Sequence, residues 1–90
     1  MRRAAKPDAN QHALVEALKK IGAKCFYIKE PVDLLVGFRG RNLLLEVKNR
    51  EGKNQITKAQ ADFLATWPGD VQVVYSIDEA ISAVVGKVVV

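Results

Sequence analysis

Two β-prone segments joined by a short turn constrain the fold of this chain more than any other feature. The segments are Val32–Phe38 and Leu43–Asn49, and Arg39-Gly40-Arg41-Asn42 lies between them. A polar, glycine-containing link between two such segments is typical of an antiparallel β-hairpin. The sequence therefore predicts that the start of the first segment lies beside the end of the second.

Charged side chains share one face of the second segment. Because side chains alternate along a strand, Glu46 and Lys48 project from one face and Val47 from the other. Two strand rises separate them by about 6 to 7 Å. The hairpin also brings Asp33 close to Glu46. Neighbouring carboxylates repel each other, and a hard divalent cation with oxygen ligands removes that penalty. The pattern predicts a magnesium or manganese site.

Helix signals on both sides of these strands complete an α/β pattern. Pro7-Asp8-Ala9-Asn10 can start a helix over about residues 9–21, since its apolar positions share one stripe. Thr57-Lys58-Ala59-Gln60 and Ser76-Ile77-Asp78-Glu79 both have the form of a capping box. Further strands are expected at Lys24–Lys29 and Val71–Tyr75. A crossover helix between the third and fourth strands makes them parallel. The expected order is α-β-β-β-α-β-α, with a mixed sheet flanked by helices in one domain.

Two apolar groups outside the strands carry expectations of their own. Phe63, Leu64 and Trp67 recur at helical spacing and are expected to face the core rather than to stack on bases. Trp67-Pro68-Gly69 ends that helix. Gly86–Val90 is either an extra edge strand or a dimer contact, because exposed valines at a free terminus promote aggregation.

The order of these residues resembles the PD-(D/E)XK nuclease superfamily, with Pro-x-Asp, a spacer, Glu-x-Lys on a strand, and a glutamine on the following helix. The order Asp33, Glu46-Val47-Lys48, Gly52, Gln60, Gly69 and 71–76 is similar to the VRR-NUC family in its small stand-alone form. The resemblance covers about residues 10 to 80. It implies a restriction-endonuclease-like PD-(D/E)XK core over about residues 10–85.

The resemblance implies a role for each residue of the motif. Asp33, Glu46 and the main-chain carbonyl of Val47 would hold Mg2+ or Mn2+. Lys48 would orient or deprotonate the attacking water. Gln60 would position the nucleophile or the phosphate. The reaction implied is hydrolysis of a phosphodiester that leaves 5′-phosphate and 3′-hydroxyl ends.

Two of these candidates also have ordinary structural explanations. Gln60 can serve as the partner of Thr57 in the capping box. Resolvase-like members of the superfamily carry a glutamate on the first helix that reaches the metal site, so the resemblance implies that Glu16 contacts a second metal or a metal-bound water. The alternative is an ion pair with Lys20 one turn later.

Basic residues are concentrated near the motif in the sequence. The chain carries 14 Lys and Arg against 10 Asp and Glu, a net charge of +4. Clustering of this kind favours a phosphate backbone as partner, against the alternative of a solvated polar surface. The candidate DNA contacts are Arg39, Arg41, Arg50, Lys53 and Lys58.

A structure-selective DNA endonuclease is therefore the expected function, with branched or Holliday-junction DNA as substrate. A small chain gains stability by forming a homodimer, and a two-fold dimer places two sites on two strands. One alternative is a catalytically inactive nucleic-acid-binding module or subunit with a nuclease-like fold. Another is a salt-bridged cross-strand cluster on a structural domain.

The remaining sequence signals concern compartment and redox chemistry. Cys25 is the single cysteine, so an internal disulfide and a thiolate zinc site are excluded, and a passive core thiol is expected. No apolar stretch reaches the roughly 18 residues of a membrane span. Arg2-Arg3 is not followed by a signal-peptide hydrophobic region. We expect a soluble, cytoplasmic protein without a membrane partner.

Overall fold

A computed structural model describes residues 9–49 and 56–86 of the chain. Within these ranges, helices and strands follow one another in the predicted order. The elements are α1 (Ala9–Lys20), β1 (Lys24–Tyr27), β2 (Leu34–Phe38), β3 (Arg41–Val47), α2 (Lys58–Thr66), β4 (Val71–Val74) and α3 (Ile77–Val85).

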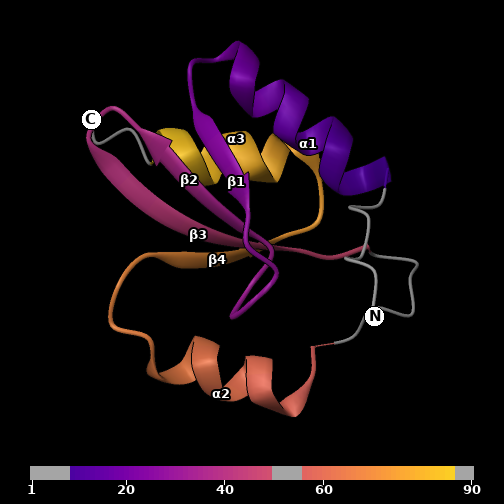
Figure 1. Cartoon of the computed structure of the whole chain (residues 1–90), viewed down its shortest axis with the longest axis vertical. Coiled ribbons are helices and arrows are strands. Elements are labelled where there is room, and N and C mark those ends of the chain that lie inside the picture. The colour runs from indigo at the N-terminus through magenta and orange to yellow at the C-terminus, as the bar shows by residue number, and fades with distance from the viewer. Residues whose placement is uncertain (1–8, 50–55, 87–90) are drawn as a thin grey trace, which may run out of the picture.

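The strands form a mixed sheet in the order β1-β2-β3-β4 (Figure 1). β1, β2 and β3 pair antiparallel, and β4 runs parallel to β3, as expected for a helical crossover between them. α1 and α3 lie on one side of the sheet and α2 on the other (Figure 1). The predicted α/β architecture, a mixed sheet flanked by helices, is therefore confirmed.

The hydrophobic core lies between the sheet and the α1–α3 layer. It is formed by side chains such as Leu14 and Leu18 of α1, Leu34 of β2 and Leu45 of β3, which are fully buried. Each such side chain stabilises the fold by about 1.5 to 3 kcal/mol through burial. Because Leu45 points into this core, its neighbour Glu46 must point to the opposite, α2 side of the sheet.

The hairpin turn is shorter than the sequence suggested. Arg39 and Gly40 alone form it, both with positive φ, at 50° and 83°. Positive φ at both central residues is the signature of a two-residue turn that matches the twist of its strands. Arg41 and Asn42, expected in the turn, therefore pair in β3.

The first strand ends earlier than expected, at Tyr27. Lys29 has a φ of 73°, which turns the chain out of the extended conformation. The amides of Ile28 and Lys29 instead donate to the carbonyl oxygen of Asp33. The loop between β1 and β2 is thus fastened at Asp33, one residue before β2 begins.

α2 packs differently from the prediction. None of its residues is buried, and Phe63 and Leu64 are only half-buried. Trp67, which follows the helix, is 44% exposed and stacks on Phe63 at 5.2 Å between ring centroids. The expected core role of this apolar face was wrong, because the core forms on the other side of the sheet.

α3 begins at a cap that differs in one bond from the predicted capping box. The Ser76 hydroxyl accepts from the amide of Glu79 as expected. The Glu79 carboxylate, however, accepts from the amide of Tyr75 at 2.8 Å, one residue before the cap. At the other end, Gly86 closes the helix with a φ of 87°.

Candidate functional site

Two carboxylates meet at one end of the sheet, where β2 begins and β3 ends. Leu34 pairs with Leu45, so the preceding Asp33 lies across from Glu46. The Asp33 amide donates to Glu46 Oε1 at 3.2 Å, and Asp33 Oδ2 accepts from the Val47 amide at 2.8 Å. The predicted closeness of Asp33 and Glu46 is therefore confirmed, and each acid is oriented by the backbone of the neighbouring strand.

Glu46 and Lys48 form a buried ion pair on the α2 side of the sheet. Lys48 Nζ lies 3.0 Å from Glu46 Oε2. Their relative exposures are 2% and 7%, and among the described residues they are the buried polar ones. The strand spacing predicted a larger separation, which the flexible lysine side chain closes. Carboxylates and ammonium groups are seldom buried unless they are paired.

Gln60, on the first turn of α2, completes the predicted capping box and also faces Glu46 and Lys48. The side-chain oxygen Oε1 of Gln60 accepts from the backbone amide of Thr57 at 3.2 Å. The backbone amide of Gln60 donates to Thr57 Oγ1 at 3.1 Å, and these two bonds complete the capping box. Gln60 Nε2 donates to Glu46 Oε2 at 2.8 Å, and Lys48 Nζ donates to Oε1 at 3.4 Å. We refer to Asp33, Glu46, Lys48 and Gln60 as the sheet-end cluster.

Thr57 belongs to this arrangement although it was predicted only as a helix cap. The Thr57 hydroxyl accepts from the Gln60 backbone amide, and the Thr57 backbone amide donates to the Gln60 side chain. Together these bonds orient the side-chain NH2 group of Gln60 toward Glu46. The capping-box pattern was the sequence signal for this contact. The pattern alone did not predict that the first turn of the helix faces Glu46.

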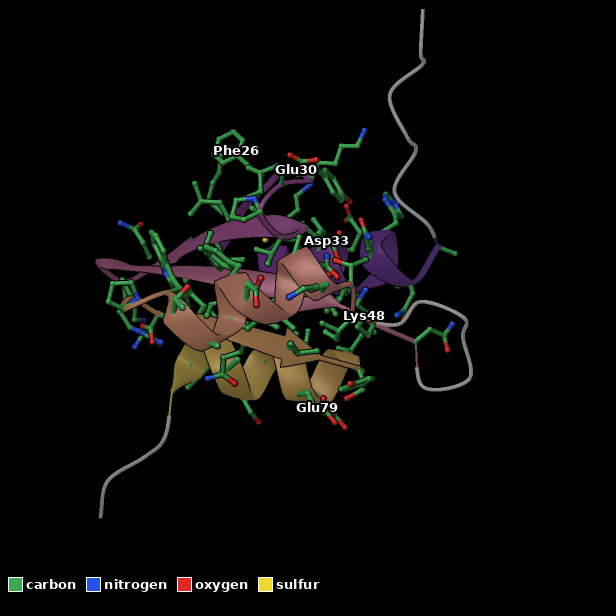
Figure 2. All side chains as sticks on the ribbon, turned by 90° about the horizontal axis from the view of Figure 1, so that it is seen from below. Phe26, Glu30, Asp33, Lys48 and Glu79 are labelled. Atoms are coloured by element: carbon green, nitrogen blue, oxygen red, sulfur yellow. The ribbon has the colours of Figure 1, made fainter. Side chains whose placement is uncertain are left out.

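The donor set of the sheet-end cluster suits a hard divalent cation. Two carboxylates and one ammonium leave a formal charge of −1, which a cation can neutralise. The Val47 amide points toward Asp33, and in a strand the carbonyl of a residue points to the same side as its amide. The Val47 carbonyl therefore faces the side of β3 on which Asp33 lies. Figure 2 shows Asp33 and Lys48 at the same end of the sheet, near the start of α2.

The cluster lacks a third acid. Over residues 9–49 and 56–86, no group of three His, Cys, Asp or Glu side chains converges in a way that could hold a metal ion. Asp33 and Lys48 each have a further interaction beyond those given above. The buried side-chain nitrogen and oxygen atoms in the described ranges all have hydrogen-bond partners.

Glu16 lies on the α1 side of the sheet, away from the buried ion pair. It pairs with Lys19 at 3.4 Å rather than with the predicted Lys20. It lines a cavity of about 320 Å³ together with Cys25 and Tyr27. Burial raises the pKa of Tyr27, and the nearby Cys25 and Glu16 raise it further. Glu16 therefore faces the end of β1, whereas the sheet-end cluster faces α2.

The residues predicted to contact DNA lie in different parts of the molecule. Arg39 is exposed at the hairpin turn, over the Phe38 ring at 5.2 Å, at the end of the hairpin opposite Glu46. Lys58 lies on the first turn of α2 near the sheet-end cluster and is 89% exposed, 3.8 Å from Asp62. Arg50 and Lys53 lie outside the described residues.

Arg41 stabilises the fold through its side-chain contacts. Its guanidinium donates to the Val84 carbonyl at 2.7 Å, at the end of α3, and to Asp70 at 3.0 Å. Cations stabilise helix C-termini, where carbonyls lack partners. The clustering of basic residues around the motif in the sequence therefore does not persist in space for Arg39 and Arg41.

No family model, curated protein or solved structure matches this chain. The assignment of the site consequently depends on its geometry and chemistry. No helix in the described ranges is long and apolar enough to cross a membrane.

Proposed function

We propose that this chain is a metal-dependent DNA endonuclease with a PD-(D/E)XK core of the VRR-NUC type. The observation that supports the proposal is the buried Glu46–Lys48 pair, joined by Asp33 and by Gln60 from a separate helix. These are the residue types, in the order along the chain, that the resemblance requires. They come together at one end of the sheet.

The energetics of the pair favour a functional explanation over a purely structural one. Removing two charges from water costs several kcal/mol per ion, and apolar residues of similar size often give equal or higher stability. A small domain gains little stability from burying Glu46 and Lys48 on the side of the sheet away from its core. Groups held in this way are candidates for chemistry.

Asp33, Glu46 and the Val47 carbonyl would hold Mg2+ or Mn2+. A bound cation of this kind supplies charge neutralisation at the phosphoryl oxygens and lowers the pKa of a coordinated water. Lys48 would orient the attacking water and donate to a phosphoryl oxygen as negative charge develops there. Gln60 would hold Glu46 in place and help to position the nucleophile. Glu16 lines a cavity at the end of β1 rather than the sheet-end cluster, so the proposal gives it no direct contact with this metal.

Branched DNA is the preferred substrate, with the homodimer as the active form. A single basic domain recognises backbone shape more readily than base sequence, since phosphate contacts carry no sequence information. A two-fold dimer would present two sites to the two strands that must be cut at a junction. Exposed Lys58, beside the sheet-end cluster, would contact the phosphate backbone.

Cleavage of a labelled four-way junction and of its matched linear duplex tests the proposal. Wild-type protein and the Glu46→Ala variant are compared with Mn2+ and with EDTA. We expect metal-dependent cutting of the junction that Glu46→Ala abolishes. Asp33→Ala should behave in the same way and Lys48→Ala nearly so, all with DNA binding largely retained. Asp78→Ala, which removes an exposed acid on α3, is the matched control.

The second candidate is an inactive DNA-binding module with the same fold. The observation in its favour is that both Glu46 oxygens already have protein partners, Oε1 from Asp33 and Oε2 from Gln60 and Lys48. Tight junction binding without scission in any metal would select this module. Loss of binding in parallel with loss of cutting would contradict the roles given to Asp33 and Glu46.

A further inference from the structure

An apolar groove lies on the same side of the sheet as the sheet-end cluster, between β2 and β3 and the residues that follow α2. It has a volume of about 250 Å³, and its surface includes Leu35 of β2, Leu44 of β3 and Trp67. Asn42 and Asp70 are the polar side chains that line it. The volume is somewhat below the roughly 300 Å³ at which pockets for drug-sized ligands begin. A flat ring system is a suitable occupant.

The strand register places the near edge of this groove two residues along the sheet from the two acids. Leu35 is two residues after Asp33, and Leu44 is two residues before Glu46, so all four side chains share one face. Two residues along a strand correspond to about 7 Å. A nucleotide whose phosphate lies at the acids could therefore reach the groove with its own base or its neighbour's.

An aromatic and a basic side chain of β1 lie on the same face of the sheet, next to Leu35 of the groove. Phe26 of β1 pairs with Leu35, is 55% exposed, and has Lys24 Nζ 5.8 Å from its ring centroid. Figure 2 shows Phe26 projecting from the sheet away from Lys48. Asp70, the acid at the groove, is neutralised by Arg41. Exposed rings combined with cations are the composition of surfaces that bind unpaired nucleic acid.

We propose that this groove takes an unpaired nucleobase of a nucleotide next to the scissile phosphate, stacked on the Trp67 indole. The inference builds on the nuclease function proposed above and specifies its substrate. A base in an intact duplex is stacked inside the helix and cannot enter the groove. The enzyme therefore acts where a nucleotide at the cut is unpaired or can unstack, as at a branch point whose base pairs open, a flap or a single-stranded region.

Gly69 holds the indole in place by lacking a side chain. A Cβ at residue 69 would lie 2.8 Å from Trp67 Nε1, closer than real contacts allow. The φ of Gly69 does not lie in the left-handed region, so Gly69→Ala does not strain the backbone there. This substitution displaces the ring without removing it, which makes it a second probe of the groove.

Trp67 fluorescence tests the inference directly, because Trp67 is the one tryptophan of the chain. The probes are a short oligothymidylate, the same strand with abasic nucleotides, and a matched blunt duplex, all titrated in EDTA. We expect quenching by oligothymidylate and much less by the other two. Trp67→Ala should weaken oligothymidylate binding by about 5- to 150-fold, measured by anisotropy. Trp67→Phe should retain most of the affinity and Gly69→Ala should lower it.

Other outcomes overturn the inference and remain separable from failure of the nuclease. Equal quenching by the abasic strand would show that backbone charge, not a base, is bound. Quenching or a blue shift of wild-type Trp67 that depends on protein concentration alone, together with a dimer that Trp67→Ala loses in sedimentation, would show that a second copy covers the groove. Metal-dependent cutting that is unchanged in Trp67→Ala would leave the nuclease intact and reject the groove. Quenching by oligothymidylate without cutting in any metal would support the groove and reject the nuclease.

Discussion

Gln60 donates a hydrogen bond to Glu46 over 2.8 Å, and the same Gln60 side chain completes the cap of α2. The first turn of a helix and a buried carboxylate on a strand are therefore joined by one amide group. Because the amide has one acceptor and one donor end, the two functions use different atoms and can be separated by substitution.

Gln60→Glu should lower stability at neutral pH. The new carboxylate still accepts from Thr57, but it cannot donate to Glu46 and places a like charge beside it. Repulsion raises the pKa of the new carboxyl group in the folded state above its unfolded value. The loss of stability is thus present at pH 7 and diminishes as the pH falls toward the ordinary carboxyl range. Urea denaturation at pH 7 and pH 5 measures this difference.

Thr57→Ala is the matched control for that experiment. It removes the hydroxyl that caps the helix but leaves the Gln60 contact with Glu46 chemically possible. We expect a loss of about 1 kcal/mol that is nearly independent of pH. An equal pH dependence in both variants would mean that Gln60 acts on stability only through the cap.

Replacing both members of the buried ion pair should separate stability from chemistry. Glu46→Ala removes the carboxylate that lies beside the nearly buried Lys48 ammonium and should cost about 3 kcal/mol. The double substitution Glu46→Leu with Lys48→Met fills the space with apolar atoms and should restore most of that loss. Thermal and urea unfolding measure both. The double variant should bind no Mn2+ at this site, and metal uptake equal to wild type would contradict the proposed ligand set.

Arg41 and Arg39 should respond in opposite ways to substitution by alanine. Arg41→Ala removes a charge-assisted bond to the Val84 carbonyl and the contact with Asp70, so unfolding should become easier by about 1 to 3 kcal/mol. Arg39→Ala should change stability by less than about 0.5 kcal/mol, since surface substitutions outside such networks have small effects. Circular dichroism melts distinguish them. A larger drop in melting temperature for Arg39→Ala than for Arg41→Ala would contradict the stabilising role of the Arg41 contacts.

Cys25 should be slow to react in the folded protein. Burial raises the pKa of its thiol, and Lys19 offsets this only in part. The folded thiol therefore stays protonated to a higher pH than the unfolded one, and its contribution to stability declines once the pH exceeds the unfolded value of about 8.5. Alkylation rates from pH 7 to 10, with and without urea, measure this. Equal native and urea rates at pH 8 would show that the thiol is not protected.

The hairpin and its acids were predictable because they follow local rules. Alternation with a period of two fixed the face of Glu46 and Lys48, and the short link predicted a hairpin that brings Asp33 near Glu46. The exact register was not predicted, because the two-residue turn at Arg39 and Gly40 is shorter than the expected four-residue link. The capping box predicted the start of α2 to the residue, at Thr57. In each case the relevant residues are close in sequence or joined by a short turn.

What could not be predicted depends on surfaces that form only in the folded chain. Arg41 meets Asp70 and the end of α3, which lie far along the sequence. The apolar spacing of Phe63 and Trp67 signals a side of a helix but not which surface that side will meet. The Glu79 bond to Tyr75 is an alternative to the capping box that the same residues allow.

α2 contributes no buried residue, and its Gln60 is bonded to the strand residues Glu46 and Lys48. A helix attached in this way can detach at low free energy while the rest of the fold stays closed, as partial opening in native proteins does. Detachment would expose the ion pair and open the apolar groove beside Trp67 at once. Ligands that bind across the sheet-end cluster and this helix would then stabilise the docked helix, so that substrate binding and helix docking are thermodynamically coupled.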